Sequence, residues 1–256
     1  MCEAGELTFA VVDDMALGAP VGDGAASLAA RELGPLVELL LLREQDRISE
    51  TQENTILRQS GFWSVLTLGT RDKIVELTNA AGYLRLGTSP PAEALTHLSI
   101  VTKRAAVAAG YDQRTSGMLS AAVGEIAGNI IEHSGATETG IVAYQGRQGV
   151  FEFVVADQGM GALNSLRCNA RFEAFQDDRE ALPKVLEHGV SRFDAPGRGA
   201  GFDMMFQGLA NHNGRLRFRS GDPLVTIDGR DPRNIPAKVK RRPHLQGFFA
   251  SASCAV

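Results

Sequence analysis

The chain has 256 residues, of which 44% are hydrophobic, so it can bury a sizeable core as one large domain or two small ones. Its 26 basic and 30 acidic residues give a formal net charge of −4, which offers no electrostatic reason to expect nucleic acid as the main partner. The three cysteines (Cys2, Cys168 and Cys254) are widely separated and show neither disulfide nor metal-ligand spacing.

These features indicate a cytoplasmic protein with reduced thiols. The most apolar run, residues 36–42, is far shorter than a membrane span and contains Glu38. The N-terminus lacks a basic stretch followed by an apolar one, so we expect no signal peptide and no membrane partner.

The first part of the chain reads as short strands and helices. Residues 7–12 predict a strand, and residues 25–59 are mostly helical. Pro35 either starts a second helix at its first turn or kinks one long helix. The polar second half of this stretch suits a helix that covers a partner or a dimer mate, or an ordinary layer of the same domain. A strand over 62–68 and a short helix over 71–81 follow.

The central part alternates helices and strands. A helix is expected over 92–109, and a second over 116–134 with Asp112 or Thr115 as its cap. Two strands joined by a tight turn come next, at 140–145 and 150–156.

The last part begins with residues 162–196, which have few strand signals and a helical run at 179–188 interrupted by Pro183. Beyond them we expect a helix over 202–210 and strands over 215–220, 224–227 and 247–255. The whole order predicts an α+β fold: a two-layer α/β sandwich with one mixed, mainly antiparallel sheet and helices on a single face.

The central helix carries a pair of polar residues beside its apolar stripe. Glu125 and Asn129 are four positions apart, so on a helix they lie one turn apart, with Cβ atoms about 5–6 Å from each other. The carboxylate can orient or deprotonate a nucleophile, and the amide oxygen can help to hold a hard cation such as Mg²⁺. The alternative is an ordinary surface Glu and Asn on an amphipathic helix.

Two glycine-containing stretches follow this helix. Asp157-Gln-Gly-Met-Gly161 comes directly after a predicted strand, and Gly197-Arg-Gly-Ala-Gly201 opens into the predicted helix 202–210. A dinucleotide-binding interpretation would need a strand just before the second stretch, where Phe193–Pro196 reads as a loop. We call the Glu125/Asn129 pair the first box, Asp157–Gly161 the second and Gly197–Gly201 the third. Taken in order, the three boxes resemble the nucleotide site of the GHKL superfamily, which includes gyrase, histidine kinases, mismatch-repair ATPases and anti-sigma serine kinases.

The resemblance implies a Bergerat-type ATP-binding fold over residues 91–256, with a lid at about 162–196, preceded by an N-terminal extension over 1–90. It assigns Asp157 to the exocyclic amine of adenine, which explains a preference for ATP over GTP. Gly159 and Gly161 would let the backbone pass close to the base and act as a hinge. The alternative for 162–196 is an insertion with no role in nucleotide binding.

The resemblance also implies which residues bind the phosphate end of the nucleotide. The backbone amides of Gly197, Gly199 and Gly201, at a helix start, would hold phosphate oxygens. Arg198 and the nearby Arg192 could neutralise phosphate charge or face solvent. Asn129 would complete the Mg²⁺ shell, and Glu125 would act as general base on water or on a protein hydroxyl. His133, one turn further along, is expected to pack or to cap the helix end.

The reaction is left open by these boxes. His97 lacks the flanking residues of a phosphoacceptor histidine, and the segments 180–192 and 213–221 look more like the stand-alone anti-sigma branch. We therefore expect a Mg²⁺-ATP-dependent serine/threonine protein kinase that acts on a regulatory partner protein. The alternatives are a GHKL ATPase switch that exchanges between open and closed dimers, and an ATP-binding module without turnover.

Overall fold

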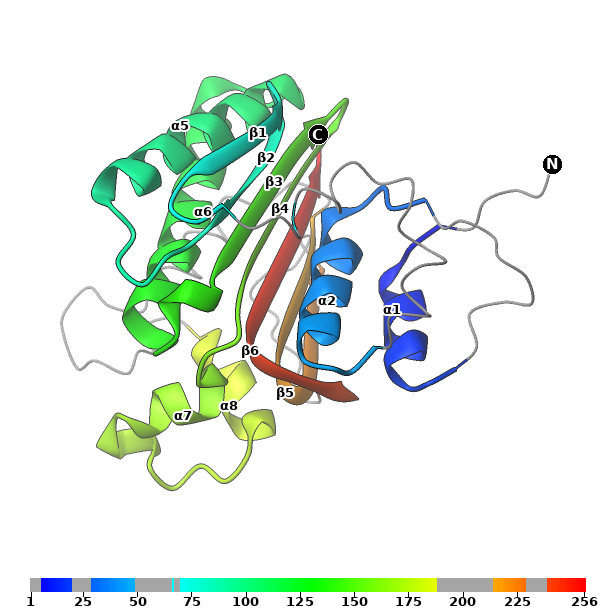
Figure 1. Ribbon diagram of the computed structural model, residues 1–256, viewed down its shortest axis with the longest axis vertical. Coiled ribbons are helices and arrows are strands. Elements are labelled where there is room, and N and C mark those ends of the chain that lie inside the picture. Colours follow the sequence, from blue (N-terminus) through cyan, green and yellow to red (C-terminus); the bar gives the residue numbers. More distant parts are fainter. Residues whose placement is uncertain (1–5, 20–28, 49–65, 67–69, 188–213, 229–238) are drawn as a thin grey trace. The chain divides into compact units, whose positions relative to one another are not determined.

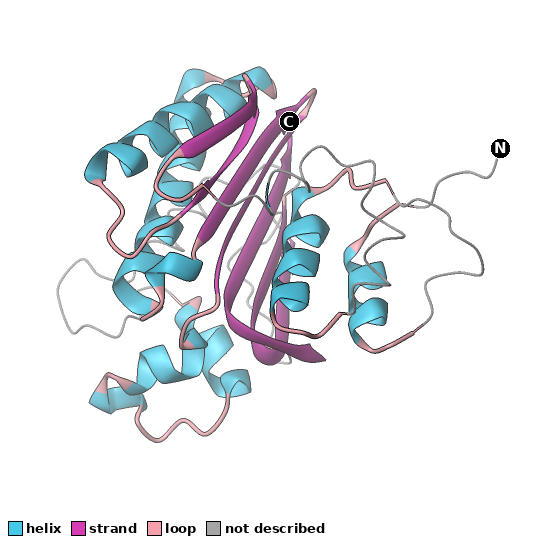
Figure 2. Cartoon of the chain, in the orientation of Figure 1, coloured by secondary structure: helices cyan, strands magenta, loops and turns pink. Residues whose placement is uncertain are grey.

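The computed structural model describes residues 6–19, 29–48, 66, 70–187, 214–228 and 239–256. The chain divides into two compact units, Met1–Gly69 and Thr70–Val256. Figure 1 and Figure 2 show the elements of the two units.

The first unit contains α1 (Phe9–Ala16) and α2 (Leu33–Glu44). The strand predicted at residues 7–12 is wrong, because residues 9–12 form the first half of α1 and Thr8 caps it. The Thr8 side chain caps this helix by accepting the Val11 amide at 3.4 Å, and Val12 and Met15 are buried three positions apart. Local capping and helical burial therefore outweigh the β-branched composition that suggested a strand.

The α2 helix has Pro35 in its first turn, as in the first of the two predicted alternatives. It ends at Glu44, and Asp46 follows with a φ of 56°, so the predicted helix does not continue unbroken toward residue 59. The strand predicted at 62–68 lies outside the described residues except for Leu66, which is helical.

The second unit is built on a six-stranded sheet in the order β1-β2-β3-β4-β6-β5, and every neighbouring pair is antiparallel. Its strands are β1 (Ile74–Thr78), β2 (Ala81–Arg85), β3 (Ile141–Arg147), β4 (Val150–Asp157), β5 (Arg215–Asp228) and β6 (Lys240–Ala255). The α+β class is confirmed, and the expected parallel component of a mixed sheet is absent from these six strands.

The helix predicted at 71–81 is wrong, because this stretch forms β1 and the turn into β2. Thr78 pairs with Ala81 across a two-residue turn, and β2 then pairs with β3. The hairpin therefore belongs to the sheet, and the second unit begins at Thr70, whereas the sequence interpretation placed a boundary near residue 91.

A row of apolar side chains crosses all six strands on the face that packs against the helices. Register places these residues side by side: Ile74, Leu84, Val142, Val155, Ala250 and Phe218. They join one buried cluster with side chains of α5 (Ala92–Ala108) and α6 (Gln113–His133). The two helices confirm the predictions for 92–109 and 116–134, and the arrangement is compatible with a two-layer sandwich (Figure 2).

Of two further predictions for the sheet, the β3–β4 hairpin is confirmed and the division of residues 215–227 into two strands is wrong. Arg147 pairs with Val150 across Gln148 and Gly149, which has a φ of +76°, so the predicted β3–β4 hairpin is confirmed. The two strands predicted between 215 and 227 are one long strand, β5, whose register shifts on both sides of Gly221.

None of the helices in the described part of the chain combines the length and apolar character that a membrane crossing needs. Cys168 is exposed and Cys254 is buried, both as free thiols, and burial raises the pKa of the Cys254 thiol to about 12. Cys2 lies outside the described residues.

Gly146 sets how closely α5 approaches the sheet. A Cβ at this position would lie 2.0 Å from the Ala105 carbonyl oxygen of α5. We therefore expect Gly146→Ala to lower the free energy of unfolding by about 1–3 kcal/mol, since the helix must move outward. The matched control is Gly117→Ala, where no atom of the described residues outside the neighbouring helix backbone lies within 4 Å, and a helix interior should gain about 0.5–1 kcal/mol. Denaturant unfolding of both variants checks the pair, and equal effects would contradict this account of the packing.

Candidate functional site

The structure describes two of the three predicted boxes. The third, with Gly197, Arg198, Gly199 and Gly201, lies outside the described residues, as does Arg192. The residues that can be placed are those of α6 and of the turn that follows β4.

The α6 helix presents Glu125 and Asn129 at the edge of its buried stripe. Asp112 caps its start by accepting the Thr115 amide at 2.8 Å, as predicted. Glu125 is exposed and Asn129 is half-buried, and neither has a hydrogen-bond or ion-pair partner among the described residues. Both polar groups are therefore available to a ligand or to water.

Asp157, at the end of β4, is a buried carboxylate with only 4% of its surface exposed. Its Oδ1 accepts the Gly159 amide at 2.8 Å, and the Phe248 amide also donates to the carboxylate. No cationic side chain in the described part of the chain pairs with it. A carboxylate has about four acceptor positions, so two amide donors leave capacity for another donor.

Burial raises the pKa of Asp157 from its ordinary value of 3.8 to about 6, and the Gly159 and Phe248 amides only partly offset that shift. The group is therefore mainly ionised at neutral pH, although the protein surroundings disfavour its charge. A buried charge of this kind is often found at a functional site.

The turn after Asp157 is held against the C-terminal end of α6. The Met160 amide donates to the Ser134 carbonyl at 2.8 Å, and a Cβ at Gly159 would lie only 2.1 Å from that carbonyl oxygen. On the other flank, the Gln158 amide donates to Thr139 Oγ1 at 2.9 Å. This close approach explains the glycine at 159 and brings the second box to the helix of the first.

The Asp157 turn therefore contacts the C-terminal end of the helix that carries Glu125 and Asn129. Asn129 comes five positions before Ser134, which corresponds to about 7.5 Å along the helix axis. Among the described residues, no atom outside the neighbouring backbone of α6 lies within 4 Å of a Cβ built at Gly128, next to Asn129.

Gly247 of β6 is a residue of this region that the sequence interpretation missed. It has a φ of +84°, and a Cβ there would lie 2.0 Å from the Asp157 carbonyl oxygen. The signal available in the sequence was an isolated glycine inside a strand pattern, which often marks a close approach between two backbones.

The segment after the turn contains α7 (Gly161–Arg167) and α8 (Asp178–Val185). The first amides of α7 are already bonded within the protein: the Ala162 amide donates to Ser220 Oγ at 2.8 Å and the Leu163 amide to Asp178 Oδ1 at 3.2 Å. Side chains of both helices join the buried cluster, including Leu166 and Leu182. This described part of the predicted lid is therefore packed into the core.

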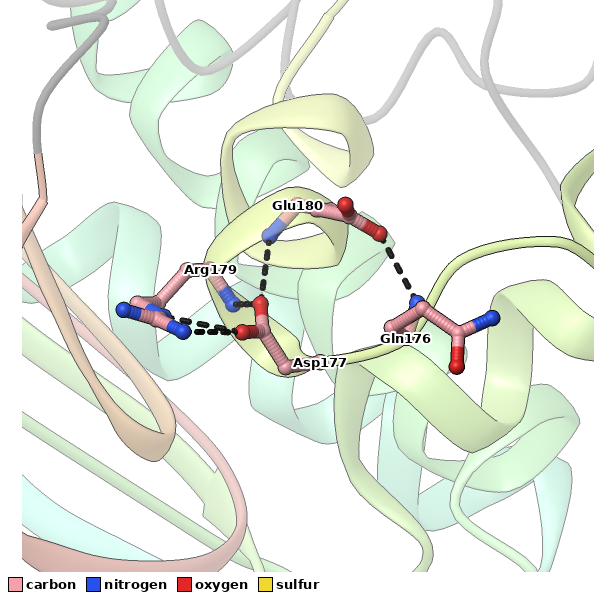
Figure 3. A network of polar contacts seen from close by, with 4 residues as sticks. All are labelled: Gln176, Asp177, Arg179 and Glu180. Atoms are coloured by element: carbon pink, nitrogen blue, oxygen red, sulfur yellow. Dashed lines mark hydrogen bonds and ion pairs between the residues drawn. The ribbon is translucent and has the colours of Figure 1, made fainter.

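The start of α8 is fixed by a polar network, shown in Figure 3. The Asp177 side chain accepts the amides of Arg179 at 2.9 Å and Glu180 at 3.3 Å, and it also accepts the Arg179 guanidinium. The Glu180 carboxylate in turn accepts the Gln176 amide at 2.8 Å. The Arg179 guanidinium holds the pKa of Asp177 below its usual range.

The two histidines considered in the sequence analysis, His133 and His97, lie on different helices. His133 is in the last turn of α6, with 20% of its side chain exposed and its Nε2 4.0 Å from Glu132. His97 is on α5, 3.7 Å from Glu76 Oε1 and half exposed. Among the described residues, no group of three or more His, Cys, Asp or Glu could hold a metal ion.

The chain matches no model of a protein family, no curated protein and no solved structure. The geometry of α6 and the Asp157 turn therefore carries the functional argument.

The buried charge of Asp157 should have a measurable effect on stability. Because its folded pKa is raised, ionised Asp157 opposes folding by about 3 kcal/mol above pH 6, and this penalty disappears as the pH falls through 6 toward 3.8. We therefore expect Asp157→Asn to be more stable than the wild type by about 1–3 kcal/mol at pH 8, with the difference shrinking steadily toward pH 4.5. Denaturant unfolding of both proteins across this range tests it, and a variant that is less stable at pH 8 would contradict it.

Proposed function

We propose that the chain binds ATP with Mg²⁺ and acts as a regulatory serine/threonine protein kinase of the anti-sigma type, with the phosphoacceptor on a partner protein. The observation that carries the nucleotide part is Asp157: a buried carboxylate at a strand end, with spare acceptor capacity, beside a helix that bears Glu125 and Asn129.

The chemistry of the base fits this carboxylate. The exocyclic amine of adenine donates hydrogen bonds, whereas guanine carries a carbonyl acceptor at the same ring position and would face a repulsive oxygen. The amides of Gly159 and Phe248 hold the carboxylate in place, and its isolation from described cations leaves its charge for the ligand.

Asn129 and Glu125 would serve the other end of the nucleotide. The Asn129 amide oxygen is a hard donor, so it can join phosphate oxygens and waters around a Mg²⁺ ion, which neutralises the phosphate charge when bound. Exposed Glu125 can take the proton of a partner hydroxyl while that oxygen bonds to the γ-phosphorus and ADP leaves. The same carboxylate acting on water would give an ATPase.

The remaining assignments rest on the sequence. Gly197, Gly199 and Gly201, with Arg198, are proposed to hold the phosphates. A lid movement of 162–196 is part of the same proposal, and it would require the core contacts of Leu166 and Leu182 to break. A cytoplasmic location and a homodimer are part of the same proposal.

Asp157→Asn should remove adenine recognition while the protein stays folded. An amide in place of the carboxylate loses the charge-assisted acceptor, so we expect ATP affinity to fall by at least about tenfold at pH 7.5. In the wild type, affinity should also fall as the pH drops below about 6, where Asp157 takes up a proton. The variant controls for protonation of ATP itself, because its own pH profile lacks the contribution of Asp157. An unchanged ATP affinity in Asp157→Asn would contradict base recognition by this residue.

Glu125→Ala should separate binding from chemistry. Loss of a general base typically slows a reaction by about 10²–10⁴-fold, whereas ATP affinity should change little. The measurement follows γ-labelled ATP with Mg²⁺: label in free phosphate indicates an ATPase, and label on an added partner indicates the kinase. Turnover at the wild-type rate in Glu125→Ala would remove Glu125 from the mechanism.

A further inference from the structure

The turn that carries Asp157 is held on a third side by a hydroxyl group of β5. Ser220 is fully buried, and its Oγ accepts the Ala162 amide at 2.8 Å, just after the turn. The same Oγ donates to Asp178 Oδ1 of α8 at 3.1 Å. A hydroxyl has one proton, so donation to Asp178 leaves its lone pairs for the Ala162 amide.

Asp178 extends this contact to a second amide of α7. Its Oδ1 also accepts the Leu163 amide at 3.2 Å. Its other oxygen lies over the backbone of Gly221, where a Cβ would be 2.5 Å away and φ is +63°. Elements β5, α7 and α8 therefore meet in one hydrogen-bonded relay, at the point where the register of β5 shifts.

The relay lies against the end of the Asp157 turn. Gly161 has a φ of +73°, and a Cβ there would be 2.8 Å from Ser220 Oγ. The turn is thus fixed by Ser134 at its middle, by Gly247 at its start and by Ser220 at its end. The first and second contacts are between backbones, whereas the third depends on side chains, as do the bonds from the Gln158 amide to Thr139 Oγ1 and from Gln246 Nε2 to the Gln158 carbonyl oxygen.

We propose that Ser220 and Asp178 are positioning residues for adenine recognition. The inference rests on the proposed function, because the residue that they position is Asp157. Without the hydroxyl, the Ala162 amide loses its acceptor and the start of α7 keeps only the Leu163–Asp178 bond, so the turn can shift and the Asp157 carboxylate no longer lines up with the exocyclic amine. Selectivity for adenine should then be lost more than general affinity for nucleotides.

The test compares binding of ATP and inosine triphosphate, whose base carries a carbonyl oxygen in place of the amine. We expect the wild type to prefer ATP, and Ser220→Ala and Asp178→Ala to reduce that preference by about 3- to 10-fold. Asp178→Asn is the matched control, because its amide oxygen can still accept from Ser220 and should keep the preference within about twofold of wild type. A smaller folded fraction lowers binding of both nucleotides equally, so the ratio is insensitive to simple destabilisation.

The outcomes distinguish failure of the positioning role from failure of the proposed function. A selective wild type with unchanged selectivity in Ser220→Ala and Asp178→Ala overturns the positioning role. If Asp178→Asn is as unselective as Asp178→Ala, the role of Asp178 as an acceptor for the Ser220 hydroxyl is overturned. If the wild type binds neither nucleotide, the proposed function is wrong. If it binds both equally, Asp157 does not recognise the base. Either result also contradicts the positioning role of Ser220 and Asp178.

Discussion

The burial of one carboxylate is the constraint on which the site depends. Asp157 ends a central strand with 4% of its surface exposed, and two backbone amides only partly compensate its charge. A neutral side chain would fit the fold at lower energy, and the proposed function gives the acid a purpose, because a ligand that donates a hydrogen bond needs a strong acceptor. Under the proposed function, stability and ligand binding are therefore opposed at this position.

The rest of the second unit can be understood as the frame for that turn. One apolar row runs through all six strands under α5 and α6, and Gly146 lets α5 lie directly on the sheet. The end of α6 is thereby fixed relative to the end of β4, and Gly159 and Gly247 allow backbones to meet on both sides of the carboxylate. The contacts that pack the core therefore also fix the position of the candidate site.

Features with a local cause could be predicted from the sequence, and those with a distant cause could not. The periodicity of α6 and the strand before Asp157 are local and were predicted correctly, and the Asp112 cap was one of two predicted alternatives. The strand at Ile74–Thr78 was read as a helix because its state is decided by a hairpin that pairs with β3, over sixty residues later. Ser220 and Gly247 were missed for the same reason, since their role exists only where β5 and β6 return to the turn.

The account is tested most directly by equilibrium binding of ATP and GTP to the full chain in the presence of Mg²⁺. Base recognition by a buried acceptor predicts saturable binding of one ATP per chain and GTP binding weaker by at least about tenfold, because the guanine carbonyl would leave the carboxylate without a donor. Equal affinity for the two nucleotides, or no binding of ATP, would contradict it.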